Sequence, residues 1–283
     1  MEVILALAAA LLFSLGTVLQ QQIASTASEE EARRAGFLLR LARQPRWLAG
    51  VTADALGFAA QAAALAIGRL VVVQPLLAST LVFSLPLGAK LGGRRVVRRD
   101  MVAALVVTAG LAVFLVVADP TGGRDDATTA AWIVSFGVTA VVCAPLTLAA
   151  RGRPAAQRAG LVGAAAGVLF GLTAGLTKAT VEQLDEGVLA VFTHWHLYAL
   201  VVVGYVGTSL SQSSLQTGAL APSVATQMSL DPIASLLLGI FAFDETVHED
   251  TAGLIAALVA FAVMIGGIVT LAAAEQEPAE APR

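Results

Sequence analysis

The chain has 283 residues, of which 57% are hydrophobic and 13% are charged, with a mean hydropathy of +0.81 and a net charge of −3. Because a soluble domain carries roughly 25% charged residues, this composition excludes an ordinary soluble protein. The single cysteine, Cys143, excludes an internal disulfide and a cysteine-based metal site.

The apolar residues form blocks of about 20 residues, the length that a helix needs to cross the hydrocarbon core of a membrane. In lipid the backbone polar groups must pair within the segment, so each block should be a helix. A transmembrane β-barrel is excluded because its strands of about 10 residues alternate apolar and polar side chains. We therefore predict an all-α integral membrane protein with about nine transmembrane helices. Their expected ranges are 2–24, 47–67, 70–91, 101–118, 129–149, 159–180, 197–218, 221–243 and 251–273.

The first block, 2–24, has a second interpretation as a cleaved signal peptide, because the small residues Ser25-Thr26-Ala27 follow it. Two features favour a membrane helix. The block begins with Glu2 and no basic residue, and its apolar run is too long for a signal sequence. The segment 32–44 mixes apolar and basic residues and predicts either a short helix in the membrane interface or a plain connecting loop.

Basic residues predict the orientation of the chain. With nine spans, 14 of the 17 basic residues fall on one side, in the segments 25–46, 90–99 and 151–158 and at Arg283. The other side keeps only Arg69 and Arg124, and its loops are acidic. Because cytoplasmic loops are enriched in Lys and Arg, we place the basic side in the cytoplasm of a bacterial-type plasma (inner) membrane. The N-terminus is then outside and the C-terminus is cytoplasmic.

An internal repeat relates the first four predicted helices to the last four. Four matches recur in the same order at offsets of 155 to 157 residues. They pair 12–15 with 169–172, 61–66 with 216–221, Gln74-Pro75 with Asp231-Pro232, and Gly110 with Gly267. Four spans return the chain to its starting side, so the fifth helix inverts the second unit. The predicted organisation is a first repeat at 1–118, a linking helix at 119–158, a second inverted repeat at 159–273 and a disordered cytoplasmic tail at 274–283.

Two stretches carry a resemblance to known transporters. Residues 231–245, from Asp231-Pro232 to Phe243-Asp244-Glu245, resemble the paired motif of the drug/metabolite transporter superfamily, EamA-like type, in which a small-residue helix with a central proline ends near a glutamate. The helix at 70–91 matches this motif in part, because Lys90 stands near the position of the acid. The segments 43–50 and 73–76 resemble the NIPA-type magnesium transporter branch. The resemblance covers nearly the whole chain.

This resemblance implies a secondary transporter of a small metabolite or drug-like solute that works by alternating access. In inverted-repeat transporters the solute site lies near the midplane between the repeats. The NIPA-type resemblance implies Mg²⁺ as an alternative solute. A non-transporting membrane scaffold stays open as a function of another class.

Charges inside a membrane span cost about 2.5–3.5 kcal/mol each and are functional candidates by default. Asp231 lies near the middle of the helix at 221–243. We expect helix breaks at Pro75 and Pro232, and carbonyls freed beside Asp231 would help to form a cation or proton site. A helix cap or a structural hydrogen bond is the alternative role. Asp54, in the helix at 47–67, either shares a cavity with Asp231 or is an interfacial residue that contacts water or an arginine.

Lys178 lies near the outer end of the helix at 159–180. It either pairs with Glu182 or Asp185, or lines the cavity, and a fixed cation there would disfavour Mg²⁺. Its repeat mate is Gln21. The full predicted pathway comprises Asp231, Gln74, Lys178, Asp54, Gln21 and Gln216.

The sequence carries only weak signals for metal binding and none for enzyme activity. No metal site is firmly predicted, although Asp231 and Asp54 would be the ligands if the solute were Mg²⁺. His194 and His196 form only a weak metal motif, because no third ligand accompanies them. The chain carries no nucleotide-binding or hydrolase motif, so we expect no enzyme activity and no cofactor. The expected partners are a small solute or ion and the lipid bilayer, without nucleic acid, and a homodimer stays open.

Overall fold

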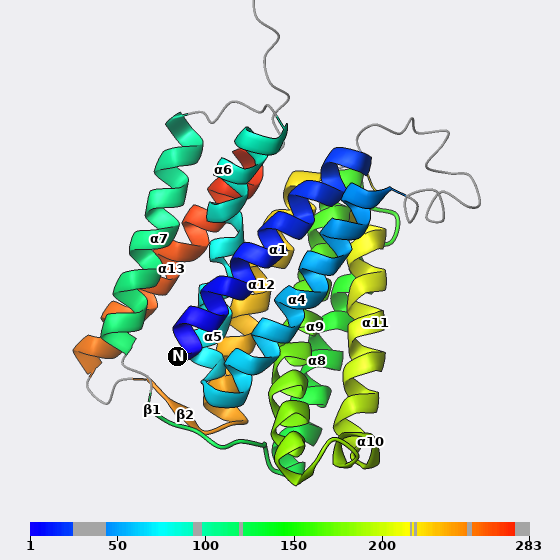
Figure 1. The fold of residues 1–283 in the computed structure, drawn as a ribbon, viewed down its shortest axis with the longest axis vertical. Coiled ribbons are helices and arrows are strands. Elements are labelled where there is room, and N and C mark those ends of the chain that lie inside the picture. The colour runs from blue at the N-terminus through cyan, green and yellow to red at the C-terminus, as the bar shows by residue number, and fades with distance from the viewer. Residues whose placement is uncertain are drawn as a thin grey trace, which may run out of the picture.

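The computed structural model describes residues 1–24, 44–92, 98–118, 121–215, 217, 220–247 and 251–274. These residues are almost entirely helical (Figure 1). In the first part of the chain the helices are α1 (Glu2–Ala24), α4 (Pro45–Ile67), α5 (Leu70–Leu77), α6 (Ser79–Gly92), α7 (Arg98–Ala118) and α8 (Thr129–Ala149). In the second part they are α9 (Ala155–Glu182), the 3₁₀ turn η1 (Gln183–Glu186), α10 (Ala190–Thr193), α11 (Trp195–Leu215), α12 (Leu220–Phe241) and α13 (Thr251–Ala274).

The helical fold predicted from the apolar blocks is confirmed. Each predicted helical range falls on helix in the structure, with ends that differ by a few residues. Five helical segments in the described residues are long and apolar enough to cross a membrane. They are Glu2–Leu19, Pro45–Ile67, Leu70–Gly88, Thr129–Ala149 and Ala155–Glu186. Shorter apolar stretches lie within α7, α12 and α13.

The sequence predicts one helix over the range 70–91, whereas the structure has two helices there. Helix α5 ends at Leu77, Ala78 forms a turn, and α6 begins at Ser79. Pro75 lacks a backbone N–H, and the Ala78 N–H closes the turn by donating to Pro75 O at 3.1 Å. The interruption therefore lies three residues after the proline, and it makes α5 a separate short helix.

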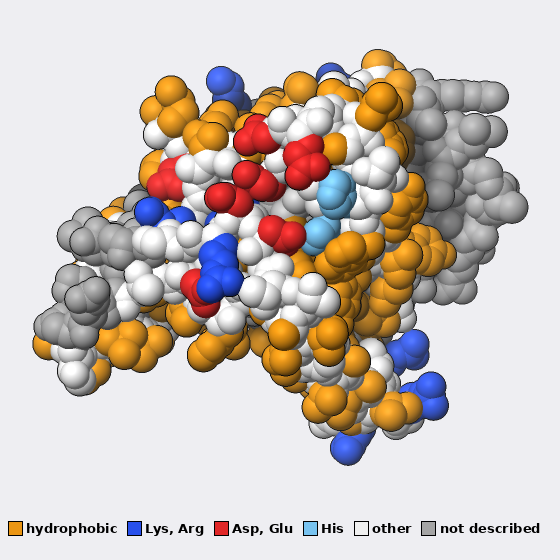
Figure 2. Space-filling model, turned by 90° about the horizontal axis from the view of Figure 1, so that it is seen from below, with side chains coloured by type: hydrophobic (Ala, Val, Ile, Leu, Met, Phe, Trp, Pro, Cys, Tyr) orange, Lys and Arg blue, Asp and Glu red, His pale blue; other side chains and the backbone are white. Residues whose placement is uncertain are grey.

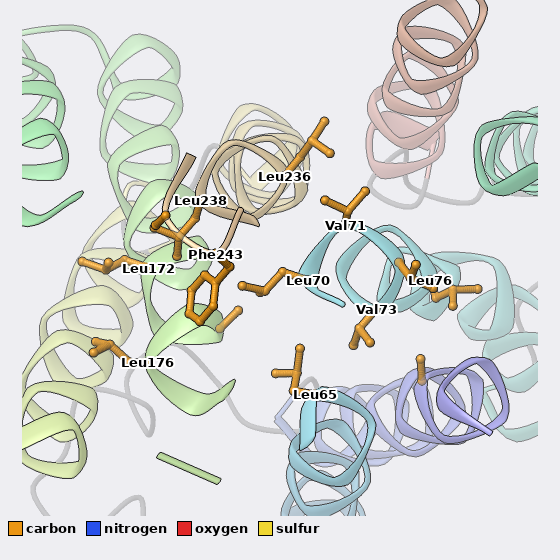
Figure 3. Packing of buried hydrophobic residues seen from close by; sticks show 14 of the residues in the cluster. Leu65, Leu70, Val71, Val73, Leu76, Leu172, Leu176, Leu236, Leu238 and Phe243 are labelled. Atoms are coloured by element: carbon orange, nitrogen blue, oxygen red, sulfur yellow. The ribbon is translucent and has the colours of Figure 1, made fainter. Parts of the chain in front are cut away.

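The helices pack in two sets and one pair. Helix α1 packs on α4, α5 and α6, and α9 packs on α8, α11 and α12. Helices α7 and α13 pack against each other at one side of the molecule (Figure 1). The two sets meet where α5 contacts α12 and where α4 and α5 contact α9. In this core the side chains of Leu65, Leu70, Leu176 and Phe243 are buried together (Figure 3).

Glycines on one face of α9 let α12 approach closely. A Cβ at Gly163 would meet Ser223 O, and one at Gly167 would meet Gln227 O. At Gly171 a Cβ would collide with Ala234. Small residues allow this kind of close backbone approach between membrane helices. These three glycines, which we call the glycine stripe, are therefore a packing surface for α12.

Several segments that connect helices lie at one end of the molecule. Strand β1 (Thr121–Gly122) pairs antiparallel with β2 (Glu245–Thr246), and these are the only strands among the described residues. The N-terminus, the end of α9 and the start of α11 lie at the same end (Figure 1). The predicted tail beyond 274 and the segment 32–44, apart from Gln44, lie outside the described residues.

Candidate functional site

A cavity of about 340 Å³ lies among α1, α4, α5, α6, α9 and α12, and we call it the central cavity. Three polar residues that the sequence predicted as site residues line it, namely Asp54, Gln74 and Asp231. Three aromatic residues line it as well: Phe13, Phe58 and Phe170. This volume is at the lower end of the range of about 300–1,000 Å³ that small-molecule pockets occupy. The structure therefore brings residues from both halves of the chain to one pocket of ligand size.

Asp231 lies on α12, half-buried at the central cavity. Ser235, one turn further along the helix, donates a hydrogen bond from Oγ to Asp231 Oδ1 at 3.3 Å. Pro232 is buried beside it, but α12 runs through this proline without interruption, which differs from the expected helix break. A proline removes only one backbone donor. Neighbouring helices can support such a position in a membrane helix.

Gln74 lies on α5 and is 3% exposed. Its amide nitrogen, Nε2, is buried and has no hydrogen-bond partner within the described part of the chain. Leaving a buried polar group unpaired costs about 1–3 kcal/mol. Gln74 is also one of the residues that line the central cavity.

Asp54 lies where α4 crosses α1. The facing residue on α1 is Gly16, and a Cβ at that position would collide with the Asp54 carboxylate. The glycine therefore lets the two helices enclose this side chain at the edge of the central cavity. Asp54 and Asp231, which come from separate helices, border the same cavity.

Lys178 does not line the central cavity. Its neighbour Thr177 does, whereas Lys178 faces the end of the molecule that carries β1 and β2. The Lys178 Nζ lies 2.7 Å from Glu245 Oε1, and the two side chains are 8% and 0% exposed. The sequence suggested pairing with Glu182 or Asp185, and the structure corrects this pairing to Glu245. A place for Lys178 on the solute pathway stays a prediction. Strand β2 brings Glu245 to this side of α9 from 67 residues away.

Glu245 connects three elements through one carboxylate. Its Oε1 accepts the N–H of Leu70 and its Oε2 accepts the N–H of Val71, both at 2.9 Å. These amides are the first two of α5, where a helix has unpaired N–H groups and partial positive charge. The Lys178 ammonium also lies 5.0 Å from the ring centroid of Phe243. We call Lys178, Glu245 and the two α5 amides the buried latch.

A second cavity of about 240 Å³ lies beside the buried latch. Among the residues that line it are Glu2, Arg69, Arg124 and Lys178. The backbone N–H of Arg69 donates to Glu2 Oε2 at 3.2 Å, and Arg69 Nε donates to Gly122 O at 2.9 Å. Arg124 pairs with Asp244 at 2.6 Å, and both side chains are more than half exposed. These four charged side chains are thus held by backbone groups or by Asp244 and Glu245 next to the cavity.

The same end carries most of the acidic side chains in view, together with the histidines (Figure 2). His196 is 4% exposed, and its Nδ1 lies 2.5 Å from Gln183 Nε2. Its Nε2 lies 3.2 Å from Asp126 Oδ2, outside hydrogen-bond geometry. Asp126 Oδ1 accepts the indole N–H of Trp132 at 2.9 Å. No group of three or more His, Cys, Asp and Glu side chains suited to a metal occurs among the described residues.

Two predicted pathway residues cannot be placed at the cavity. Gln216 lies outside the described residues, and Gln21 belongs to α1 but its side chain is not among those described. Sequence reasoning named Glu245 only as the end of a motif and did not name the three phenylalanines as lining residues. The match of 12–15 with 169–172 contains Phe13 and Phe170, so the repeat itself carried a signal for two of them.

Comparisons with known proteins identify one relative. No protein-family model matches the chain, and no solved structure matches it. An uncharacterized protein of Corynebacterium glutamicum, Cgl0250/cg0304, is 30% identical over 284 residues. The alignment covers 100% of this chain and 98% of the relative, so the similarity extends over every element described above.

Proposed function

The chain belongs to the same family as this Corynebacterium protein, and from the central cavity we propose that it is a secondary transporter of a small solute. The supporting observation is the convergence of Asp231 and Gln74, which come from the two halves of the chain, on one cavity of ligand size. Ionisable residues within membrane helices are costly, so they usually belong to a solute or proton pathway. We propose that these two residues, with Asp54, bind the solute.

An inverted repeat is part of this proposal, and reciprocal contacts between α7 and α13 support it. Gly110 of α7 faces Met264 of α13, and Gly267 of α13 faces Val107 of α7. A two-fold relation requires such reciprocity, because each contact must recur with its partners exchanged. Residues 107 and 264 are separated by the same 157 positions as residues 110 and 267. The two contacts are therefore one contact seen twice under the proposed symmetry.

The lining of the central cavity follows the same relation. Phe13 and Phe170 are equivalent under the 157-residue offset, as are Gln74 and Asp231, and all four line the cavity. We propose that the pseudo-two-fold axis passes through the cavity, with α5 and α12 as its paired central helices. Inverted-repeat transporters bind their solute at this kind of position. The nine-span topology and a fold of the drug/metabolite transporter type complete the proposal.

Alternating access would then require one end of the cavity to close while the other opens. The buried latch is suited to closing one end, because it ties α9 and β2 of the second half to the start of α5 in the first. We propose that this end faces the outside, since it bears the acidic loops, and that the turn with Arg151 and Arg153 faces the cytoplasm. Opening to the outside would separate α5 from Glu245.

The test is uptake of a mixed solute extract by proteoliposomes. Vesicles with the protein are incubated with a polar cell extract, and their contents are compared by mass spectrometry with those of protein-free vesicles. At least one solute should accumulate, and Asp231→Asn should abolish that accumulation while the protein still inserts. Asp185→Asn, which removes an exposed carboxylate from η1, should leave uptake intact. If no solute accumulates above the level in protein-free vesicles, the transporter proposal is rejected and a membrane scaffold is favoured.

Magnesium is the second candidate solute, because Asp54 and Asp231 border the same cavity. Mg²⁺ keeps several waters and is usually bound through one or two carboxylates, which matches that pair. A fluorescent Mg²⁺ indicator inside the same vesicles distinguishes the two solutes. A Mg²⁺ flux that is lost in Asp231→Asn, without uptake of any organic solute, would favour magnesium.

A further inference from the structure

We infer that the solute of the central cavity is a small organic cation, an amine or quaternary ammonium compound with an apolar or aromatic body. This inference rests on the proposed transport function and names the chemical class that the cavity would select. Charge, aromatic lining and one unpaired amide carry it.

The ionisable side chains that line the central cavity are acidic. Asp54 and Asp231 line it, and no Lys, Arg or His is among its lining residues in the described part of the chain. Lys178 follows the lining residue Thr177 in sequence, but it pairs with Glu245 and lines the second cavity. A carboxylate away from bulk water is stabilised chiefly by an opposite charge. For Asp231, whose hydrogen bond comes from the neutral Ser235 hydroxyl, a cationic solute would provide that charge.

The apolar lining of the cavity suits an organic cation better than a bare metal ion. The rings of Phe13 and Phe58 meet edge to face with centroids 5.3 Å apart, and Phe170 lines the cavity from α9. Faces of aromatic rings attract ammonium groups, and the recognition of quaternary amines commonly uses several rings together. The same rings would cover the apolar body of the solute. A hydrated Mg²⁺ ion would instead leave these rings against water.

Gln74 adds a polar requirement. Its Nε2 is buried and lacks a partner among the described residues, and Gln74 is one of the residues that line the cavity. A solute that carries one hydrogen-bond acceptor, such as a hydroxyl or carbonyl oxygen, would satisfy this donor. The combination of a cationic head, an apolar body and one acceptor describes small amino alcohols and related amines.

The test compares three solutes of nearly equal shape and different charge. Phenethylamine is protonated at neutral pH, 2-phenylethanol is neutral and 3-phenylpropanoate is anionic. Each is added to the purified protein in detergent at pH 7, and the apparent melting temperature is measured over a concentration series. A ligand that binds only the folded state raises this temperature by mass action. We expect phenethylamine to bind about ten-fold or more tightly than the alcohol, and the carboxylate to give no shift.

Variants locate the effect. Asp231→Asn should remove the phenethylamine shift, and the matched control Asp185→Asn should keep it. An equal or larger shift with the alcohol or the carboxylate, a shift that survives Asp231→Asn, or no shift with the amine would each overturn the inference. The ranking of the three solutes in the unmodified protein is decisive by itself if Asp231→Asn fails to fold.

Failure of this inference differs from failure of the transport proposal. Binding in detergent does not depend on flux, so amine binding without vesicle uptake would reject transport and keep the ligand class. Asp231-dependent uptake of a neutral or anionic solute would keep the transport proposal and reject the ligand class.

Discussion

At the residue scale, the buried latch is the most demanding feature of the molecule. Removing two charges from water costs several kcal/mol per ion, and only close pairing with further hydrogen bonds offsets that cost. Glu245 meets this condition with three donors, from Lys178, Leu70 and Val71. The exposed pair of Arg124 and Asp244 lies at the same end and provides a natural comparison.

Replacing Lys178 by Met should destabilise the protein by about 3–5 kcal/mol, because it leaves the Glu245 carboxylate buried without its counter-charge. The matched control is Arg124→Met, which breaks an exposed pair and should cost about 0–1 kcal/mol. Chemical unfolding in detergent measures both. The double variant Lys178→Met with Glu245→Leu should recover part of the loss. Equal costs for Lys178→Met and Arg124→Met would contradict a latch held by charge.

Gly239 permits Glu245 to lie against α12. A Cβ at this position would crowd Glu245 Oε2 and the Val71 side chain. We expect Gly239→Ala to destabilise the protein by about 1–3 kcal/mol, the usual cost of overpacking. Gly204→Ala on α11, where a Cβ meets nothing within 4 Å, should be neutral or slightly stabilising. Thermal unfolding of the two variants side by side gives the comparison, and a tolerated Gly239→Ala would show that Glu245 can move aside freely.

Membrane physics alone is enough to select three residues from the sequence that the structure brings together, although their role in a solute pathway stays a prediction. Asp54, Gln74 and Asp231 stand out because polar groups are rare in apolar blocks, and all three line one cavity. The partner of Lys178 could not be predicted, because Glu182 and Asp185 are far closer along the chain than Glu245. Only the path of the chain through β2 brings that carboxylate to α9.

At the element scale, the lengths of the helices follow from the apolar blocks, whereas their interruptions do not. Proline is compatible with both a broken and a continuous membrane helix. The chain shows both outcomes: the helix stops shortly after Pro75 and continues through Pro232. Tertiary support decides between them, and a single sequence does not reveal that support.

Close packing of α9 on α12 should be sensitive to the size of side chains on the glycine stripe. At Gly171 a Cβ already collides with Ala234 and crowds the Ser235 backbone, so Gly171→Leu should separate the helices near Asp231. We expect an aggregated or strongly destabilised protein in size-exclusion chromatography and thermal unfolding. Gly137→Leu on α8, where an added Cβ meets nothing within 4 Å, is the control and should behave like the unmodified protein. Similar behaviour of the two variants would mean that the stripe is not a packing surface.

At the scale of the whole molecule, the proposed inverted repeat predicts that the same substitution at two equivalent positions costs a similar amount of stability. Gly110 and Gly267 lie 157 residues apart and form the two reciprocal contacts between α7 and α13. We therefore expect Gly110→Leu and Gly267→Leu to lower the apparent melting temperature by similar amounts. A large loss from one variant and none from the other would contradict the proposed symmetry.

Two-sided labelling of the central cavity tests the proposed alternating access most directly. In a Cys143→Ala background, Thr173→Cys places a reporter on the wall of the cavity. Thr193→Cys and Arg153→Cys place exposed controls at the opposite ends of the molecule. Each variant is treated with a membrane-impermeant thiol reagent in right-side-out and inverted vesicles.

Each control should react from one side of the membrane only. The side from which Thr193→Cys reacts should be opposite to the side from which Arg153→Cys reacts. The Thr173→Cys reporter should react from both sides, and Lys178→Met should increase its reaction from the side on which Thr193→Cys reacts. A reporter that reacts from one side alone, in the presence and absence of the latch, would contradict alternating access through this cavity.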